Sequence, residues 1–123
     1  MTPPELLDRF IAFIPAFEAQ WNSEQNHYRV DARHYTLHEV CSEFSNCFRD
    51  HYIQLSDDAF TRLFNFIELH IVELSSPETL IDNAMCTCFL ENLSSEPAGH
   101  AAKEWMGRKT LAFFELWHVG PPY

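Results

Sequence analysis

The feature that most constrains this chain is the spacing of its apolar residues, which recur at steps of three and four along most of the sequence. The clearest case lies in residues 57–74, where one stripe contains Phe60, Leu63, Phe64, Ile67, His70, Ile71 and Leu74, and a second contains Phe66, Leu69 and Val72. Such steps place side chains on one face of an α-helix. A helix that is apolar around most of its circumference packs on several sides. We therefore predict an all-α bundle with this helix at its centre.

Start and stop signals predict a bundle of about five to seven helices. Pro3 and Pro4 suit a first helical turn, and Pro15 restarts the helix. Ser56 before two aspartates and Ser76 before Pro77 are typical N-terminal caps. The predicted helices cover residues 3–14, 15–21, 37–52, 57–74, 76–93 and 100–118, with Gly107 as a C-terminal cap that divides the last one. Residues 22–36 are predicted as a loop, with a short extended piece at 27–30.

A weak internal repetition allows a second description of the same architecture. The sequences Phe66-Ile67-Glu68 and Phe89-Leu90-Glu91 are each followed by a leucine, a serine pair and a proline. This pattern is typical of a duplicated helix-turn unit in helical-repeat proteins, or of two helices that end in the same way. Both interpretations keep the all-α fold class.

Length and composition predict one domain over residues 1–123. The chain is 46% hydrophobic and contains eleven phenylalanines, which is enough apolar material for one core. No apolar run approaches the roughly 18 residues of a membrane span, and the first residues do not resemble a signal peptide. We therefore expect a cytoplasmic protein. Its four cysteines, Cys41, Cys47, Cys86 and Cys88, are expected to stay reduced as small core or boundary residues.

The acidic residues are concentrated in the middle of the chain. The net charge of the whole chain is −10, and residues 37–96 carry eleven acids against Arg49 and Arg62, a balance of −9. A negative field of this kind repels nucleic acid and anionic lipid and attracts basic surfaces. The expected partner is therefore a basic protein.

Few residues have the spacing of a catalytic or metal site. His34, His38 and Glu39 would offer two imidazoles and a carboxylate to a metal ion if the helix began before His34. The alternative is a solvated junction between loop and helix. The pair Cys86 and Cys88 points to different sides of a helix and has no second cysteine pair at zinc-site spacing. The sequence contains no nucleophile-elbow motif and no glycine-rich phosphate loop. We therefore expect no catalytic residues, no cofactor and no enzymatic activity.

The C-terminal half resembles a known group of small helical bacterial proteins. The segment Cys88-Phe89-Leu90-Glu91-Asn92-Leu93, a polar break, and then Trp105-Met106-Gly107-Arg108-Lys109-Thr110 are similar to a helix and turn of a family of unknown function. The resemblance covers residues 60–118 and departs from the family where Arg108 replaces a proline. The small, acidic and helical character also resembles immunity proteins that accompany interbacterial toxins. Neither resemblance supplies catalytic residues.

Three functional hypotheses follow from these observations, and the third of them is a small hydrolase with its site at His34, His38 and Glu39. The first is an immunity protein that neutralises a cognate bacterial toxin by binding its basic surface. Its expected partner-binding residues are the acids Glu39, Glu43, Asp50, Asp57, Asp58, Glu68, Glu73 and Asp82. For Glu68, the alternatives are a solvated helix face or a buried pair with Arg62 or Arg108. The second hypothesis is a helical adaptor that binds its partner in an apolar groove beside helix 57–74.

Overall fold

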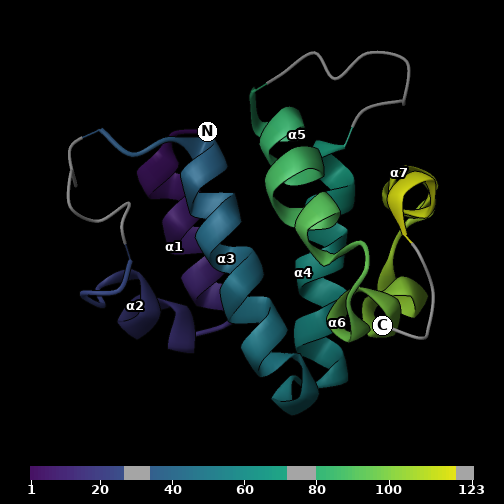
Figure 1. Cartoon of the computed structure of the whole chain (residues 1–123), viewed down its shortest axis with the longest axis horizontal. Coiled ribbons are helices and arrows are strands. Elements are labelled where there is room, and N and C mark those ends of the chain that lie inside the picture. Colours follow the sequence, from purple (N-terminus) through teal and green to yellow (C-terminus); the bar gives the residue numbers. More distant parts are fainter. Residues whose placement is uncertain (27–33, 72–79, 119–123) are drawn as a thin grey trace.

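The computed structural model describes residues 1–26, 34–71 and 80–118, and it confirms the predicted all-α class (Figure 1). The described part contains no strand. Its seven α-helices are α1 (Pro3–Phe13), α2 (Ala16–Trp21), α3 (Leu37–His51), α4 (Asp57–His70), α5 (Leu80–Ala84), α6 (Pro97–Ala102) and α7 (Arg108–Trp117). Shorter helical turns are η2 (Tyr52–Gln54), η3 (Met85–Leu90), η4 (Glu91–Leu93) and η5 (Lys103–Trp105).

Side-chain caps explain where three of these helices begin. Thr2 and Glu5 form a capping box at α1, and Thr36 and Glu39 form one at α3. The Ser56 hydroxyl accepts a hydrogen bond of 3.1 Å from the backbone amide of Ala59 at the start of α4. Each cap satisfies backbone amides that have no partner within the helix. The predicted starts near Pro3 and at Leu37 and Asp57 are therefore confirmed.

The core is a continuous cluster of phenylalanine rings around α3. Phe44 on α3 is fully buried, and its ring stacks on Phe10 of α1 with centroids 3.9 Å apart. The same ring lies 5.5 Å from the ring of Phe89 in η3 and 5.0 Å from that of Phe17 in α2. Stacked and edge-on arrangements of this kind add to the stabilisation from burial. One side chain thus joins elements from both halves of the chain.

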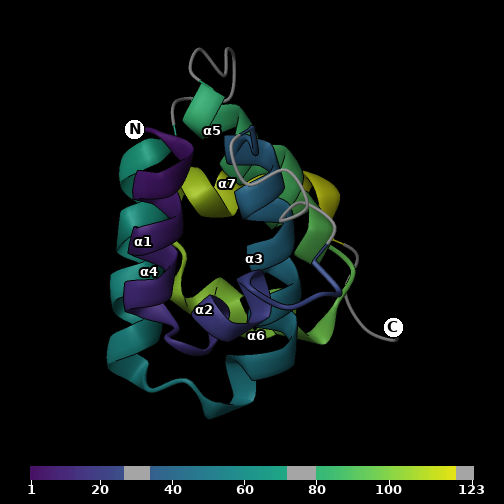
Figure 2. The same cartoon turned by 90° about the vertical axis from the view of Figure 1, so that its left-hand side faces the viewer.

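The prediction that helix 57–74 occupies the centre of the bundle was wrong, because α3 takes that place. α3 packs against α1, α2, α5 and η3, whereas α4 packs mainly against α1, α7 and η5. Figure 2 shows α1 running alongside α4. The main stripe of α4 is buried, as Phe64 and Ile67 show, but Leu69 of its second stripe is 80% exposed. α4 therefore keeps one face open.

The segment before Leu93 is helical as predicted, but its pitch changes. After α5, η3 is a π-helix and η4 is a 3-10 helix. A change of pitch rotates the buried face, because it alters the angle between successive side chains. Leu80 lies in α5, before this change, and is 72% exposed although its inward orientation was expected, while Asp82 and Cys86 are buried.

Gly107 has a different role from the predicted one. It is the N-cap of α7 rather than the C-cap of the preceding helix, and its backbone is extended, with φ −72° and ψ 175°. Two other predictions, the helix start at 76–78 and the extended piece at 27–30, lie outside the described residues.

Candidate partner-binding groove

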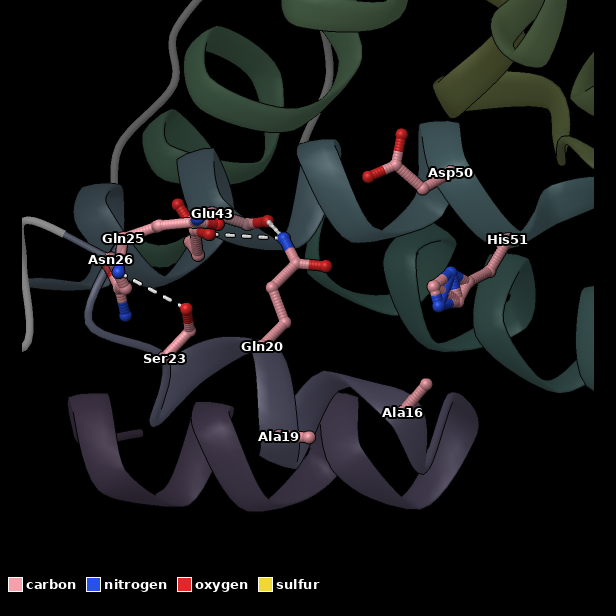
Figure 3. A pocket seen from close by; sticks show the side chains of 9 residues that line it. All are labelled: Ala16, Ala19, Gln20, Ser23, Gln25, Asn26, Glu43, Asp50 and His51. Carbon is pink, nitrogen blue, oxygen red and sulfur yellow. Dashed lines mark hydrogen bonds between the residues drawn. The ribbon is translucent and has the colours of Figure 1, made fainter.

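A polar groove between α2 and α3 contains two of the predicted acids. It has a volume of about 520 Å³ and is lined by Ala16, Ala19, Gln20, Ser23, Gln25, Asn26, Glu43, Asp50 and His51. Figure 3 shows Gln20 reaching from α2 to Glu43 on α3, with Asp50 and His51 towards the other end of the groove. Glu43 and Asp50 are seven residues apart, and therefore share one face of α3.

Hydrogen bonds fix the Glu43 end of the groove. The Gln20 side-chain amide donates to Glu43 Oε1 at 3.1 Å and to its backbone carbonyl at 3.4 Å. At the α2 wall, Asn26 is buried and its side-chain amide donates to the Trp21 carbonyl at 2.7 Å. These bonds join α2 to α3 and hold the turn after α2. The Glu43 carboxylate is therefore preorganised, whereas the Asp50 carboxylate is exposed.

The negative charge of the groove is not neutralised by Arg49, the nearby cation on α3, because Arg49 pairs with Glu96. Arg49 also donates to Asn46 Oδ1 at 2.8 Å. Among the described residues, no salt bridge includes Glu43 or Asp50. The pKa of the nearby Cys47 thiol is raised to about 12, first by burial and then by the charges of Asp50 and Glu43. The charges of both carboxylates thus raise the pKa of the same side chain, Cys47 on α3.

Three other predicted acids lie outside the groove. Glu39 is used in the capping box of α3, where its carboxylate accepts from the backbone amide and the hydroxyl of Thr36. Asp57 and Asp58 are exposed in the first turn of α4, where a negative charge stabilises the positive end of the helix dipole. Asp58 also lies 3.8 Å from Arg62 in an exposed pair, an arrangement that contributes little to stability.

Two further predicted acids, Asp82 and Glu68, are not part of an exposed acidic surface. Asp82 is 1% exposed and lies beside Cys86, with Sγ and Oδ1 3.7 Å apart. Its assignment to a partner-facing surface is therefore corrected. Glu68 is half-buried against α7. Glu73 lies outside the described residues.

Glu68 lies on α4 and caps the start of α7, which is distant from it in sequence but adjacent in the fold. Its carboxylate accepts from the backbone amides of Thr110 and Lys109, at 2.8 and 3.1 Å, and from the Thr110 hydroxyl at 2.7 Å. Burial raises the pKa of this carboxyl, but the hydrogen bonds from Thr110 and Lys109 outweigh that effect and the pKa is lowered. Gly107, the N-cap, has no side chain that could cap the helix. None of the sequence alternatives for Glu68 included a capping role.

Comparison with known proteins places this helical chain in a family. A family model described as a domain of unknown function, DUF7674, matches residues 7–118. The chain belongs to the DUF7674 family. The match covers nearly all of the described bundle, including both walls of the groove, and so extends well beyond residues 60–118. No curated protein and no solved structure matches this DUF7674 chain.

The candidate metal residues of this DUF7674 domain are engaged in other contacts. The Nε2 atom of His38 lies 2.8 Å from the Oδ1 atom of Asn83, within hydrogen-bonding distance. The Glu39 carboxylate caps α3. His34 is exposed before the helix begins. Within residues 1–26, 34–71 and 80–118, no three His, Cys, Asp or Glu side chains are grouped to hold a metal ion. The hypothesis of a site at His34, His38 and Glu39 is therefore not supported.

The cysteines pack in the interior of the bundle, as expected. Cys41, Cys47 and Cys86 are buried and Cys88 is half-buried, and all four thiols are free. Burial raises the pKa of Cys47 and Cys86 to about 12 in each case, aided by neighbouring acids. These two thiols are protonated at neutral pH, and a protonated thiol is a weak nucleophile. No helix in the described ranges is both long and apolar enough to cross a bilayer.

A second, apolar pocket lies at the other end of α3. It has a volume of about 440 Å³ and is lined by Met1, Thr2, Pro3, Tyr35, Thr36, Leu37, His38 and Leu80. Met1 is 47% exposed and Leu80 is 72% exposed, so this end of the DUF7674 bundle presents apolar side chains to solvent.

Sequence reasoning found the acidic wall of the groove but missed the opposite wall. Gln20, Ser23, Gln25 and Asn26 come from the end of α2 and the following turn. The sequence contains a signal for this wall, since residues 22–26 are all polar. A polar run is also typical of an ordinary loop, and nothing in the sequence indicates that it folds back against α3.

Proposed function

We propose that this DUF7674 domain binds a basic segment of a partner protein in the groove between α2 and α3. The observation that carries the proposal is a preformed 520 Å³ groove whose Glu43 and Asp50 carboxylates have no salt-bridge partner among the described residues. A cation from a partner would gain two charge-assisted contacts there. Because Gln20 already holds Glu43 in place, little side-chain ordering accompanies binding.

The groove suits a long cationic side chain. Its alanines at positions 16 and 19 leave room beside α2, and the rest of the α2 wall is made of polar side chains. An arginine or lysine inserted from the partner could place its aliphatic stem against the alanines and its charged end near the carboxylates. The net charge of −10 would add long-range attraction to a basic partner.

The biological role that we propose is that of an immunity protein. A toxin that acts on nucleic acid or nucleotides needs a basic active-site cleft, and an acidic helical protein can block such a cleft by occupying it. In this role the domain acts in the cytoplasm, has no catalytic activity and needs no cofactor. The proposal rests on the charge and shape of the groove, and it is independent of the family assignment.

The proposal predicts that reversing the groove charges slows association with the basic partner. We expect at least a tenfold lower association rate for the double variant Glu43→Lys/Asp50→Lys at low salt, because charge steering acts mainly on association. At 1 M salt the difference should shrink, since the Debye length falls from ~10 Å at 0.1 M to ~3 Å. The partner would first be identified by co-expressing the chain with the product of a neighbouring gene and purifying the complex. The association rate is then measured by stopped-flow mixing of the two purified proteins.

A matched control separates the groove from the overall charge. Asp8 and Glu104 are exposed and lie outside the groove. The variant Asp8→Lys/Glu104→Lys changes the net charge by the same amount, and we expect it to slow association only two- to threefold. Equal association rates for the two double variants, with unchanged helical circular dichroism, would exclude the groove as the binding site.

The alternative function, a helical adaptor, was expected to use a groove beside helix 57–74, but the apolar pocket beside Met1 and Leu80 that could serve it is not lined by α4. Its occupant would be an apolar segment of a partner, as in helix-in-groove recognition. In that case Leu80→Asp would abolish co-purification, while the groove reversals would leave it unchanged. The same binding assay therefore distinguishes the two functions.

A further inference from the structure

Two histidines from separate helical segments meet at the C-terminal end of the described chain. His100 is exposed on α6, and His118 follows the last residue of α7. His100 Nδ1 and His118 Nε2 lie 3.3 Å apart, and the ring centroids are separated by 5.4 Å. This pair is distant in sequence from the His34 and His38 positions that the sequence suggested.

The other ring nitrogen of His118 fixes its tautomer. His118 Nδ1 hydrogen-bonds to the backbone carbonyl of Ser94. A carbonyl oxygen only accepts, so Nδ1 carries the hydrogen and Nε2 presents its lone pair towards His100. The His118 ring also stacks on Phe114, with centroids 4.8 Å apart. Metal-binding histidines are typically oriented in this way, by a hydrogen bond from the second ring nitrogen to a carbonyl or carboxylate.

The separation of the two nitrogens matches the spacing around one metal ion. Two imidazole nitrogens bound at about 2.05 Å to a tetrahedral zinc ion lie about 3.3 Å from each other. We propose that His100 Nδ1 and His118 Nε2 together bind a divalent first-row transition metal ion such as Zn²⁺. A small rotation of the two side chains turns both lone pairs towards the ion, which lies off the line joining the nitrogens.

The hydrogen that lies between the two rings has to leave that position when a metal ion binds. In the hydrogen-bonded pair, His100 Nδ1 carries the hydrogen that faces His118 Nε2. When the metal ion takes that position, this hydrogen moves to His100 Nε2 through solvent, and both facing nitrogens become ligands. Within the described ranges no third acidic, cysteine or histidine ligand completes a cluster.

An ion pair lies close to this position. Glu115 lies one helical turn before His118 and pairs with Lys103 at 2.9 Å. The pKa of Glu115 is lowered, mainly by the hydrogen bond from Lys103. A bound metal ion would crosslink α6 to the end of α7.

Calorimetric titration of the full chain with ZnCl₂, and separately with NiCl₂, tests the site. We expect one equivalent of metal per chain with micromolar or weaker affinity, because only two side chains coordinate it. In His100→Asn the affinity should fall at least tenfold. His100 is exposed, so we expect this variant to fold normally, which its melting temperature without metal would verify.

The control is His34→Asn, which removes an exposed histidine elsewhere on the chain. This variant should retain the affinity and stoichiometry of the wild type. Unchanged zinc and nickel binding in His100→Asn, or no one-equivalent binding in the wild type, would overturn the proposal. The result does not depend on the partner-binding function, because neither histidine lines the groove.

Discussion

Replacing Phe44 by alanine is expected to lower the free energy of unfolding by about 3 to 5 kcal/mol. The Phe44 ring is fully buried and contacts the rings of Phe10, Phe17 and Phe89. Removing it leaves a cavity between elements from both halves of the chain, and the surrounding rings can close that cavity only in part. Because domains of this size are stable by about 5 to 15 kcal/mol, the loss would be a large share of the total. Urea denaturation followed by circular dichroism measures it.

The control for this truncation is Leu69→Ala. Leu69 lies on α4 but is 80% exposed, so its removal should change the free energy of unfolding by no more than about 0.5 kcal/mol. A similar small loss for Phe44→Ala would contradict the central position that we assign to α3.

Glu68→Ala should lower the free energy of unfolding by about 2 kcal/mol at pH 7. The change removes a carboxylate that accepts three hydrogen bonds at the start of α7, and bonds to a charged group contribute about 1.5 to 3 kcal/mol before solvent screening. Losing a helix cap alone costs typically about 1 kcal/mol. The measurement is urea denaturation of the variant and the wild type in parallel.

The contribution of Glu68 should also depend on pH in a defined direction. The folded-state pKa of Glu68 lies below its ordinary value of 4.5. Its stabilisation is therefore fully present above pH 4.5 and is lost as the pH falls through the lowered folded-state value. The difference in stability between wild type and Glu68→Ala should thus shrink under acidic conditions. The exposed control Asp57→Ala should show a smaller effect at pH 7, and a pH-independent difference for Glu68→Ala would rule out the capping role.

The local parts of the fold could be predicted from the sequence, and the tertiary parts could not. Caps and proline positions act over a few residues, which is why the starts of α3 and α4 were predicted at Leu37 and Asp57. The π-helix at Met85–Leu90 has no such local signal. The burial of Asp82 and the exposure of Leu80 depend on which face of α5 packs against α3, and the periodicity of this segment did not indicate that face.

The candidate groove was predictable only in part for the same reason. Glu43 and Asp50 share a face of one helix, so the sequence places them together. Nothing in the sequence shows that Gln20 approaches this face, because that contact depends on how α2 packs. His100 and His118 were likewise not recognised as a pair. They meet only in the folded chain, where the residue that follows α7 lies beside α6.

The contact between Glu68 and position 107 also constrains how this family can vary. A Cβ atom at Gly107 would lie 2.5 Å from the Glu68 carboxyl carbon, which is closer than non-bonded atoms can approach. A member of the family that carries a larger residue at position 107 would need a shorter or repositioned side chain at position 68. The two positions should therefore covary among homologues. For the same reason, a chimera that exchanges α7 between family members should retain its stability only if the residue at position 68 is exchanged with it.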